Sequence, residues 1–348
     1  MNNQEKIECI RTIARGLEPN VDIGEFLSKQ DCDSLLSLPP KKANTPEQTV
    51  ARALNSLAVK ERFKACAPLF SQSEFRYAVI KGAVLSQMMY HDPLVRSSGD
   101  IDILIERKDA DRLKQLLTAN GFVQGRITDS GIVPFNRREL LFQTTLSHQT
   151  APYVKSTGNK LCPYVNVDVN MDLFWGESDE KADMSLVLSH TEPMTLLGTT
   201  FQKLTPEAEL VSLCLHHYKD LNSIYLLSHG SFQLRLFFEI YKYLRTVKPD
   251  VSRLRDLCKL LNAGQYVYVF IDQTQQIFDD PQIEPYIEAL KDQQDRALHN
   301  TFGLNDRERK KWDIDLFSRL FHPNLAEHLQ ELLGDAEKEK IKINRELM

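Results

Sequence analysis

The segment Gly99–Ile105 constrains the fold of this chain more than any other, because it places two carboxylates in an otherwise apolar run. It reads Gly-Asp-Ile-Asp-Ile-Leu-Ile, so Asp100 and Asp102 lie two residues apart. Successive side chains of a β-strand point to opposite faces, and the aspartates therefore share one face while the isoleucines share the other. Two like charges on a half-buried strand repel each other unless a cation lies between them. We therefore expect a strand that carries a metal site.

A second strand is predicted at Tyr164–Trp175, where apolar residues alternate with polar ones. Its polar face carries Asp168 and Asp172, and either carboxylate could complete the site. Carboxylates from two strands could hold one or two Mg²⁺ ions, which stabilise the attacking and leaving oxygens of a phosphoryl displacement. A solvated strand face is the alternative for Asp100 and Asp102, and more so for Asp168.

A phosphate-binding turn is predicted at Lys81–Ala83, which follows the apolar run Tyr77–Ile80 and opens a helical stretch. A helix start offers free N–H groups and a positive dipole, a glycine lets a phosphate approach the backbone, and a lysine adds a cation. Arg96 could pair with a triphosphate or with Asp100, and a surface ion pair is the alternative for it.

The composition excludes several classes of protein. A net charge of −5 over 348 residues provides no global field that would attract duplex DNA. The six cysteines are scattered without a Cys-x-x-Cys pair, which argues against a disulfide framework and against a structural zinc site. No signal-peptide pattern is visible at the N-terminus, and no apolar run approaches the ~18 residues of a spanning helix. We therefore expect a cytoplasmic protein.

The regions on either side of the two predicted strands are expected to be helical. Apolar residues recur at helical spacing before residue 71, and the chain from Pro206 to its end has a helical pattern throughout. We expect a helical block at 1–70, a catalytic core at 71–200 and a helical domain at 201–348. Further strands are predicted at Phe122–Val123 and Leu140–Thr144.

These motifs resemble the signature of an uncharacterised bacterial nucleotidyltransferase family of the DNA polymerase beta-like superfamily. The resemblance covers about Tyr77 to Leu244, and the later family motif Asp-Leu-His-Trp corresponds here to Asp172–Trp175, with Phe174 in place of histidine. It also extends to Leu204–Glu207 and the helix containing His216. The residues that carry the first part of the resemblance are Lys81, Gly82, Ala83, Tyr90, Asp92, Arg96 and the segment Gly99–Ile105.

The resemblance implies an α+β fold, with a small mixed sheet that has helices on one side and is flanked by helical blocks. It implies transfer of a nucleoside monophosphate from an NTP, with ATP the expected donor, to a hydroxyl, amine or phosphate acceptor. The implied cofactor is Mg²⁺ or Mn²⁺. The implied metal and catalytic residues are Asp100, Asp102 and Asp172; the implied nucleotide-binding residues are Lys81, Gly82, Ala83, Arg96 and Gly99; Asp168, His216 and Arg138 are further candidates.

Two departures from the family pattern keep a second function open. Ala83 stands where the superfamily usually has a serine or glycine, and Phe174 replaces the histidine. Both substitutions favour a non-catalytic module that binds a nucleotide or a partner. For His216 a buried structural histidine is the alternative, and for Arg138 a solvated loop. The net charge favours a small-molecule or protein acceptor over long nucleic acid.

Overall fold

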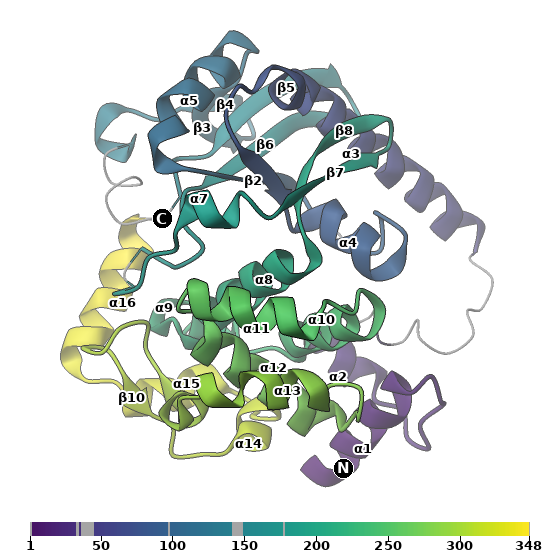
Figure 1. The fold of residues 1–348 in the computed structure, drawn as a ribbon, viewed down its shortest axis with the longest axis vertical. Helices are drawn as coiled ribbons and strands as arrows, with labels where there is room; N and C mark the ends of the chain where they lie inside the picture. The colour runs from purple at the N-terminus through teal and green to yellow at the C-terminus, as the bar shows by residue number, and fades with distance from the viewer. Residues whose placement is uncertain are drawn as a thin grey trace. The chain divides into compact units, whose positions relative to one another are not determined.

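The computed structural model describes residues 2–32, 35, 45–96, 98–140, 149–176 and 178–347. The chain divides into two compact units, each described here by itself (Figure 1). The first unit comprises Ala43–Glu209, and the second comprises Met1–Lys42 together with Leu210–Met348. The expected division into three domains at 1–70, 71–200 and 201–348 stays a prediction.

The Ala43–Glu209 unit contains a mixed sheet of eight described strands in the order β4-β3-β5-β6-β2-β1-β8-β7. β2 pairs in parallel with β6, and β1 pairs in parallel with β8, whereas the other neighbours are antiparallel. The strands are β1 (Tyr77–Ile80), β2 (Asp100–Ile105), β3 (Val123–Thr128), β4 (Gly131–Pro134), β5 (Tyr153–Asn159), β6 (Cys162–Asn170), β7 (Thr191–Leu196) and β8 (Thr199–Leu204).

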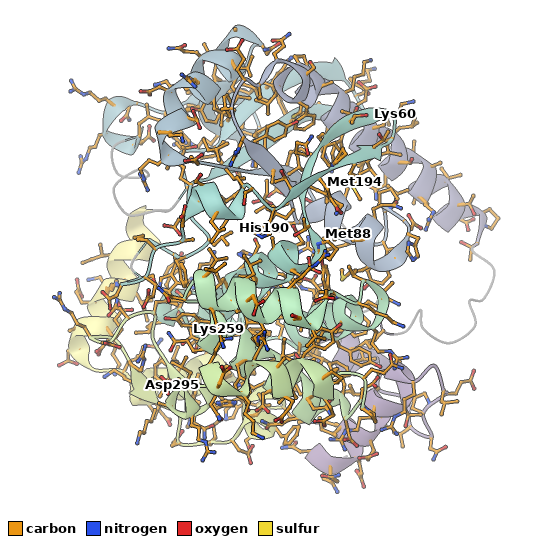
Figure 2. All side chains as sticks on the ribbon, in the orientation of Figure 1. Lys60, Met88, His190, Met194, Lys259 and Asp295 are labelled. Carbon is orange, nitrogen blue, oxygen red and sulfur yellow. The ribbon has the colours of Figure 1, made fainter. Side chains whose placement is uncertain are left out.

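One face of this sheet is buried beneath helices. The helices of the unit are α3 (Pro46–Gln72), α4 (Gly82–Tyr90), η2 (Arg107–Asp109), α5 (Ala110–Ala119) and α7 (Met184–Val187). Phe63 and Phe70 of α3 share a hydrophobic core with Ile101 and Ile103 of β2. Partly buried side chains from α4 and β7 pack against the same core, including the labelled Met88 and Met194 (Figure 2). The isoleucines of β2 therefore face the helices, and the aspartates point to the opposite face.

The sequence predicts β1 and β2 correctly and underestimates the size of the sheet. β1 and β2 have the predicted bounds. The expected small sheet is wrong, because eight described strands are present. The predicted strand Tyr164–Trp175 ends early, at Asn170. Of the predicted strand Leu140–Thr144, Leu140 is helical and the remainder lies outside the described residues.

The unexpected hairpin β7–β8 closes through a two-residue turn. Leu197 has φ 49° and Gly198 has φ 86°, and two positive φ angles are the requirement of a type I′ hairpin turn. Five of the six side chains of the edge strand β7 and three of the six of β8 are at least partly exposed, so the apolar alternation that identifies a buried strand is weak there.

The second unit is helical except for one short two-stranded sheet. The expectation that the chain is helical from Pro206 to its end is therefore wrong at that sheet. Arg11 near its N-terminus donates hydrogen bonds to the carbonyls of Gln276 and Ile277 at the end of α12 (Gly264–Phe278). No helix among the described residues is both long and apolar enough to span a membrane. The elements are α1 (Asn3–Ala14), α2 (Gly24–Lys29), α8 (Pro206–Asn222, whose first turn belongs to the sheet unit), α9 (Ile224–Leu227), α10 (Leu234–Thr246), α11 (Val251–Leu260), α12 (Gly264–Phe278), α13 (Glu284–Leu290), η3 (Lys291–Gln293), η4 (Arg296–Asn300), β9 (Thr301–Phe302), β10 (Lys310–Lys311), α14 (Leu316–Leu320), α15 (Leu325–Leu332) and α16 (Asp335–Leu347).

Candidate functional site

The turn between β1 and α4 has an unusual backbone at Lys81. This residue has φ 56° and ψ −150°, and Gly82 after it has φ 44°. A positive φ combined with an extended ψ is a region that glycine alone adopts readily, and holding another residue there costs about 1–3 kcal/mol. The Lys81 N–H donates a hydrogen bond to Glu209 Oε1 at 3.2 Å. Glu209 therefore stabilises the strained backbone of Lys81. This residue directly precedes α4, whose first N–H groups have no partner within the helix.

Glu209 is a buried carboxyl group that was not expected at the site from the sequence. Burial raises its pKa to about 7, against the opposing effects of the Lys81 N–H and the charges of Lys203, Lys81 and Arg96. Its second oxygen, Oε2, has no hydrogen-bond partner among the described residues. The first turn of α8 contains two acids, Glu207 and Glu209, and acids are common at helix starts, so the sequence does not single out Glu209.

Asp102 is the centre of the polar face of the sheet. Its Oδ1 accepts from Lys81 Nζ and from Asn170 Nδ2, each at 3.3 Å. Lys81 and Asp102 are both buried, so a cationic side chain already neutralises part of the carboxylate charge. The structure thereby joins the predicted phosphate-binding turn to the predicted metal-binding strand.

Asp168 lies beside Asp102 on the neighbouring parallel strand. The two residues are paired in the β2–β6 register, and Asp100 is paired with Asn166. Residues paired in this way point to the same face of a sheet. Burial raises the pKa of Asp168 to about 6, and the negative charges of Asp102 and Asp100 contribute to the same rise. Three carboxylates therefore share one face and destabilise one another's charges.

Asp172, which the resemblance implies as the third ligand, accepts backbone N–H groups in the structure. It lies beyond the end of β6, and its Oδ1 accepts the backbone N–H groups of Phe174 at 3.0 Å and Ala182 at 3.1 Å. Side chains that accept backbone N–H groups in this way fix turns. Phe174, at the position of the family histidine, is fully buried. The structure thus brings Asp168, rather than Asp172, beside Asp102 in register.

Ser98 supplies a hydroxyl next to the glycine of the turn. Its Oγ donates to Asp100 Oδ1 at 2.7 Å, and a Cβ built on Gly82 would lie 3.1 Å from this Oγ. Any side chain at Gly82 would therefore crowd Ser98 as well as strain the backbone. Arg62 of α3 donates to the Ser98 carbonyl and holds the loop in place. Neither Ser98 nor Arg62 was identified from the sequence, since their roles depend on long-range packing.

The remaining residues that were predicted to bind the nucleotide differ in their surroundings. Arg96 is half-buried, its N–H donates to Ser86 Oγ at 3.0 Å, and its charge acts on Glu209. Ala83, the second residue of α4, is part of the hydrophobic core. A Cβ added to Gly99 would meet no described atom within 4 Å, so nothing in the packing requires glycine there.

Arg138 and His216, the two further candidates, are each described by their own contacts. Arg138 is exposed on a helical turn after β4, where its N–H donates to Asn136 Oδ1. His216 belongs to the helical unit, where it lies close to His217 and Asp220.

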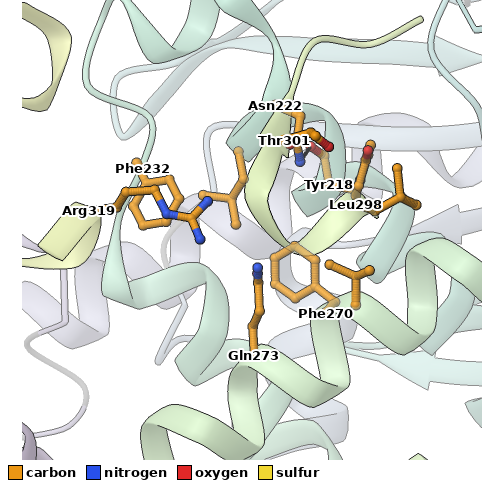
Figure 3. Close-up of a pocket in the computed structure, with 10 residues that line it drawn as sticks. Tyr218, Asn222, Phe232, Phe270, Gln273, Leu298, Thr301 and Arg319 are labelled. Atoms are coloured by element: carbon orange, nitrogen blue, oxygen red, sulfur yellow. Dashed lines mark hydrogen bonds between the residues drawn. The ribbon is translucent and has the colours of Figure 1, made fainter. Parts of the chain in front are cut away.

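The helical unit also contains a cavity of about 10 Å³ between Tyr218, Phe270 and Arg319 (Figure 3). A single water needs roughly this much space, so the cavity is far too small for a nucleotide. Two of the polar side chains that line it, Gln273 and Arg319, already donate to the His299 carbonyl.

The chemistry of the polar face fits a hard divalent cation. Its donors are the carboxylates of Asp100, Asp102 and Asp168, and oxygen ligands are those that Mg²⁺ and Mn²⁺ prefer. In the described part of the chain, these three carboxylates do not bring their oxygens within 4.8 Å of one another. Mg²⁺ commonly uses one or two protein carboxylates together with substrate phosphates, so an incomplete protein cage is compatible with it.

Comparisons with known proteins place the chain in a family. Residues 26–279 match the family described as "uncharacterised nucleotidyltransferase". No curated protein matches the chain. Among solved structures, the chain is similar to an antigenic nucleotidyltransferase-like protein from Paracoccidioides brasiliensis, with 18% identity and a TM-score of 0.36, over 68% of this chain and 94% of that one. Because the family match spans most of the sequence, this chain belongs to the uncharacterised nucleotidyltransferase family.

Proposed function

We propose that this protein transfers a nucleoside monophosphate from an NTP to an acceptor and releases pyrophosphate. The observation that carries the proposal is the contact between Lys81, at a strained helix start, and Asp102, in a group of three carboxylates. A cationic turn supplies ligands for phosphate, and grouped carboxylates supply ligands for a metal ion. Family membership supports the same reaction class.

Asp100, Asp102 and Asp168 would hold Mg²⁺ or Mn²⁺ on the polar face of β2 and β6. The ion would supply charge stabilisation for the attacking and leaving oxygens of the transferred phosphoryl group. Asp168 takes the place that the sequence analysis gave to Asp172, because its strand register sets it beside Asp102. The resemblance to the DNA polymerase beta-like superfamily agrees with carboxylates arranged on neighbouring strands.

The β1–α4 turn would bind the triphosphate. The first N–H groups of α4 lack partners within the helix, and a phosphate can accept from them. Gly82 leaves the backbone open to a close approach, and Lys81 can pair with phosphate from the same turn. Arg96 would add a second cation, and the Ser98 hydroxyl lies beside Gly82 in place of the serine that the superfamily has at the Ala83 position.

Glu209 would act as a positioning residue. Its carboxyl group holds the Lys81 N–H and thereby fixes the strained backbone that directs the lysine side chain towards Asp102. This role requires an acceptor oxygen rather than a negative charge, so a glutamine can replace it.

The acceptor is expected to be a small molecule or a protein with a hydroxyl, amine or phosphate group, and ATP is the expected donor. Incubating candidate acceptors with each NTP and Mg²⁺ and measuring their mass would identify donor and acceptor together. A mass increase of one nucleoside monophosphate supports transfer. The non-catalytic alternative predicts that calorimetry detects NTP binding while no pyrophosphate is released from any mixture.

A further inference from the structure

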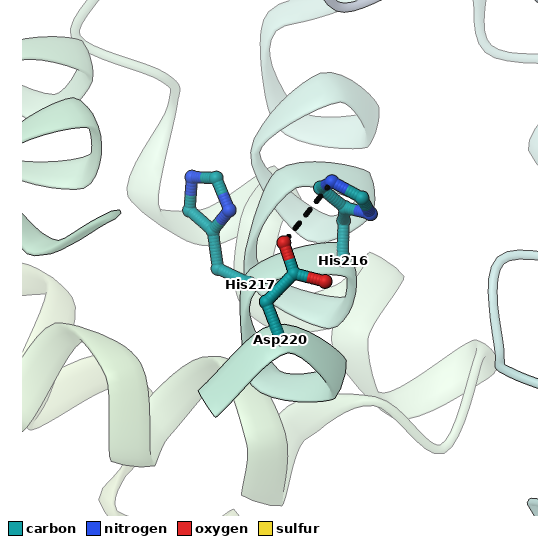
Figure 4. Close-up of side chains that lie close together, drawn as sticks. All are labelled: His216, His217 and Asp220. Carbon is teal, nitrogen blue, oxygen red and sulfur yellow. Dashed lines mark ion pairs between the residues drawn. The ribbon is translucent and has the colours of Figure 1, made fainter. Parts of the chain in front are cut away.

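The α8 helix groups three potential metal ligands outside the carboxylate site. His216, His217 and Asp220 each offer a ligand atom, and these atoms all lie within 4.8 Å of one another (Figure 4). His216 Nε2 is 3.5 Å from Asp220 Oδ2, as expected for neighbours four residues apart on a helix. The three side chains therefore converge without any long-range rearrangement.

His217 provides a second, independent indication of a ligand-binding site. Its Nε2 is 3.0 Å from Glu239 Oε2, and its side chain is only 1% exposed. Its Nδ1 has no hydrogen-bond partner among the described residues. In Figure 4 one ring nitrogen of His217 faces Asp220 and the other faces away. A buried polar atom without a partner loses its hydration and gains nothing in return.

The contact with Glu239 orients the His217 ring. When the imidazole is neutral and Nε2 carries the proton that Glu239 accepts, Nδ1 presents a lone pair. A carboxylate behind a histidine is the arrangement that orients histidine ligands at metal centres. Glu239 is buried and also pairs with Arg235 at 3.3 Å, so the carboxylate is held from a second side.

The donor set indicates the class of metal. Two imidazole nitrogens and one carboxylate oxygen suit Zn²⁺ and other late first-row divalent ions, whereas Mg²⁺ prefers oxygen ligands alone. The two oxygens of Asp220 have different neighbours. Lys219 Nζ lies 3.6 Å from Oδ1, whereas His216 lies near Oδ2. Oδ2 is therefore the oxygen that would bind the metal with the histidines.

We propose that His216, His217 and Asp220 bind one Zn²⁺ ion, with Glu239 orienting His217. Three protein ligands leave a coordination position for water. Because Glu239 belongs to α10, the bound ion would strengthen the link between α8 and α10. This proposal is independent of nucleotide transfer.

The test is metal titration of the full chain after removal of bound metals with a chelator. Calorimetry with Zn²⁺, and the visible absorption of Co²⁺ as a probe, should show one equivalent bound, with a rise in Tm. His216→Ala and Asp220→Asn should each weaken binding at least about tenfold, and Glu239→Gln should weaken it about 10–100-fold. His216 and Asp220 are only half-buried, so these variants should fold, as circular dichroism without metal would verify.

A matched control uses Asp100→Asn, Asp102→Asn and Asp168→Asn together. These changes remove the other candidate metal ligands, and Zn²⁺ binding to the α8 site should persist unchanged. The proposal is overturned if the chain binds no Zn²⁺, if His216→Ala and Asp220→Asn bind as the wild type does, or if the carboxylate variant abolishes binding.

Discussion

The sheet face and the α8 cluster both gather metal-ligand side chains, but they differ in chemistry and in charge balance. Asp100, Asp102 and Asp168 present oxygens alone, and Lys81 neutralises only part of their charge. The α8 cluster presents nitrogens from His216 and His217 beside the single carboxylate of Asp220. An excess of carboxylates beside a cationic turn favours a hard ion and phosphate, whereas imidazoles favour a softer ion.

The two regions also differ in how their geometry is fixed. The sheet face depends on long-range strand register and on a strained backbone at Lys81. The α8 cluster follows from the spacing of residues along one helix, with Glu239 as its distant support. Substitutions in the sheet should therefore change the reaction and the backbone together, and this difference can be tested.

The largest effect is expected for Asp102→Asn. It removes a proposed metal ligand and the charge partner of Lys81, so the transfer rate should fall by at least about 10³-fold, or ~4 kcal/mol in the activation barrier. The rate is measured with labelled NTP under single-turnover conditions. Thermal unfolding of the variant provides the control for folding. A rate within about threefold of wild type would contradict the assignment of Asp102.

Glu209→Gln should change the pH dependence of stability. The pKa of Glu209 is raised from 4.5 in the unfolded chain to about 7 in the folded chain, so its contribution to stability is complete below pH 4.5 and is lost as the pH rises through about 7. The wild type should lose on the order of 3 kcal/mol across this window. Denaturant unfolding at several pH values should show a flatter profile for Glu209→Gln. An equal slope in both proteins would contradict the burial of a titrating Glu209.

Lys81→Gly and Lys81→Ala separate the charge of this residue from its backbone strain. Both remove the cation and should lower the transfer rate about 10²-fold. Glycine adopts a positive φ freely, so Lys81→Gly should be about 1 kcal/mol more stable than Lys81→Ala. Equilibrium unfolding measures the difference. If alanine proves the more stable, the strained conformation is wrong.

Asp168→Ala and Asp172→Ala should show opposite effects. Asp168→Ala relieves repulsion with Asp102 and Asp100, so it should lower the transfer rate without lowering stability. Asp172→Ala leaves two backbone N–H groups without their acceptor and should cost about 2 kcal/mol of stability. Rates and unfolding free energies are measured for both variants. An inactive but stable Asp172→Ala protein, with an active Asp168→Ala protein, would restore Asp172 as the third ligand.

The sequence was most informative where local alternation decides the structure. β2 was predicted with its correct bounds because its aspartates alternate with isoleucines up to Leu104 and the isoleucines are buried. β1 was predicted from a short apolar run that is buried throughout. Lys81 and Asp102 were both predicted as site residues, and the antiparallel pairing of β1 and β2 brings them into contact.

The sequence was less informative where distant contacts decide the structure. The alternation that defines β6 continues past Asn170, but the bonds of Asp172 to Phe174 and Ala182 turn the chain. Parallel register, which pairs Asp168 with Asp102, cannot be read from either strand alone. Glu209 carries no periodic signal, because its role depends on a backbone N–H that is distant in the sequence.

The most direct test of nucleotide transfer at the sheet face measures pyrophosphate release from NTP and Mg²⁺ in the presence of an acceptor identified by its mass increase. Wild type is compared with the double variant Asp100→Asn, Asp102→Asn, and circular dichroism verifies that both are folded. We predict that wild type releases one pyrophosphate per modified acceptor and that the double variant releases none above background. Equal release by both proteins, or NTP binding by wild type without any release, would contradict the proposed reaction.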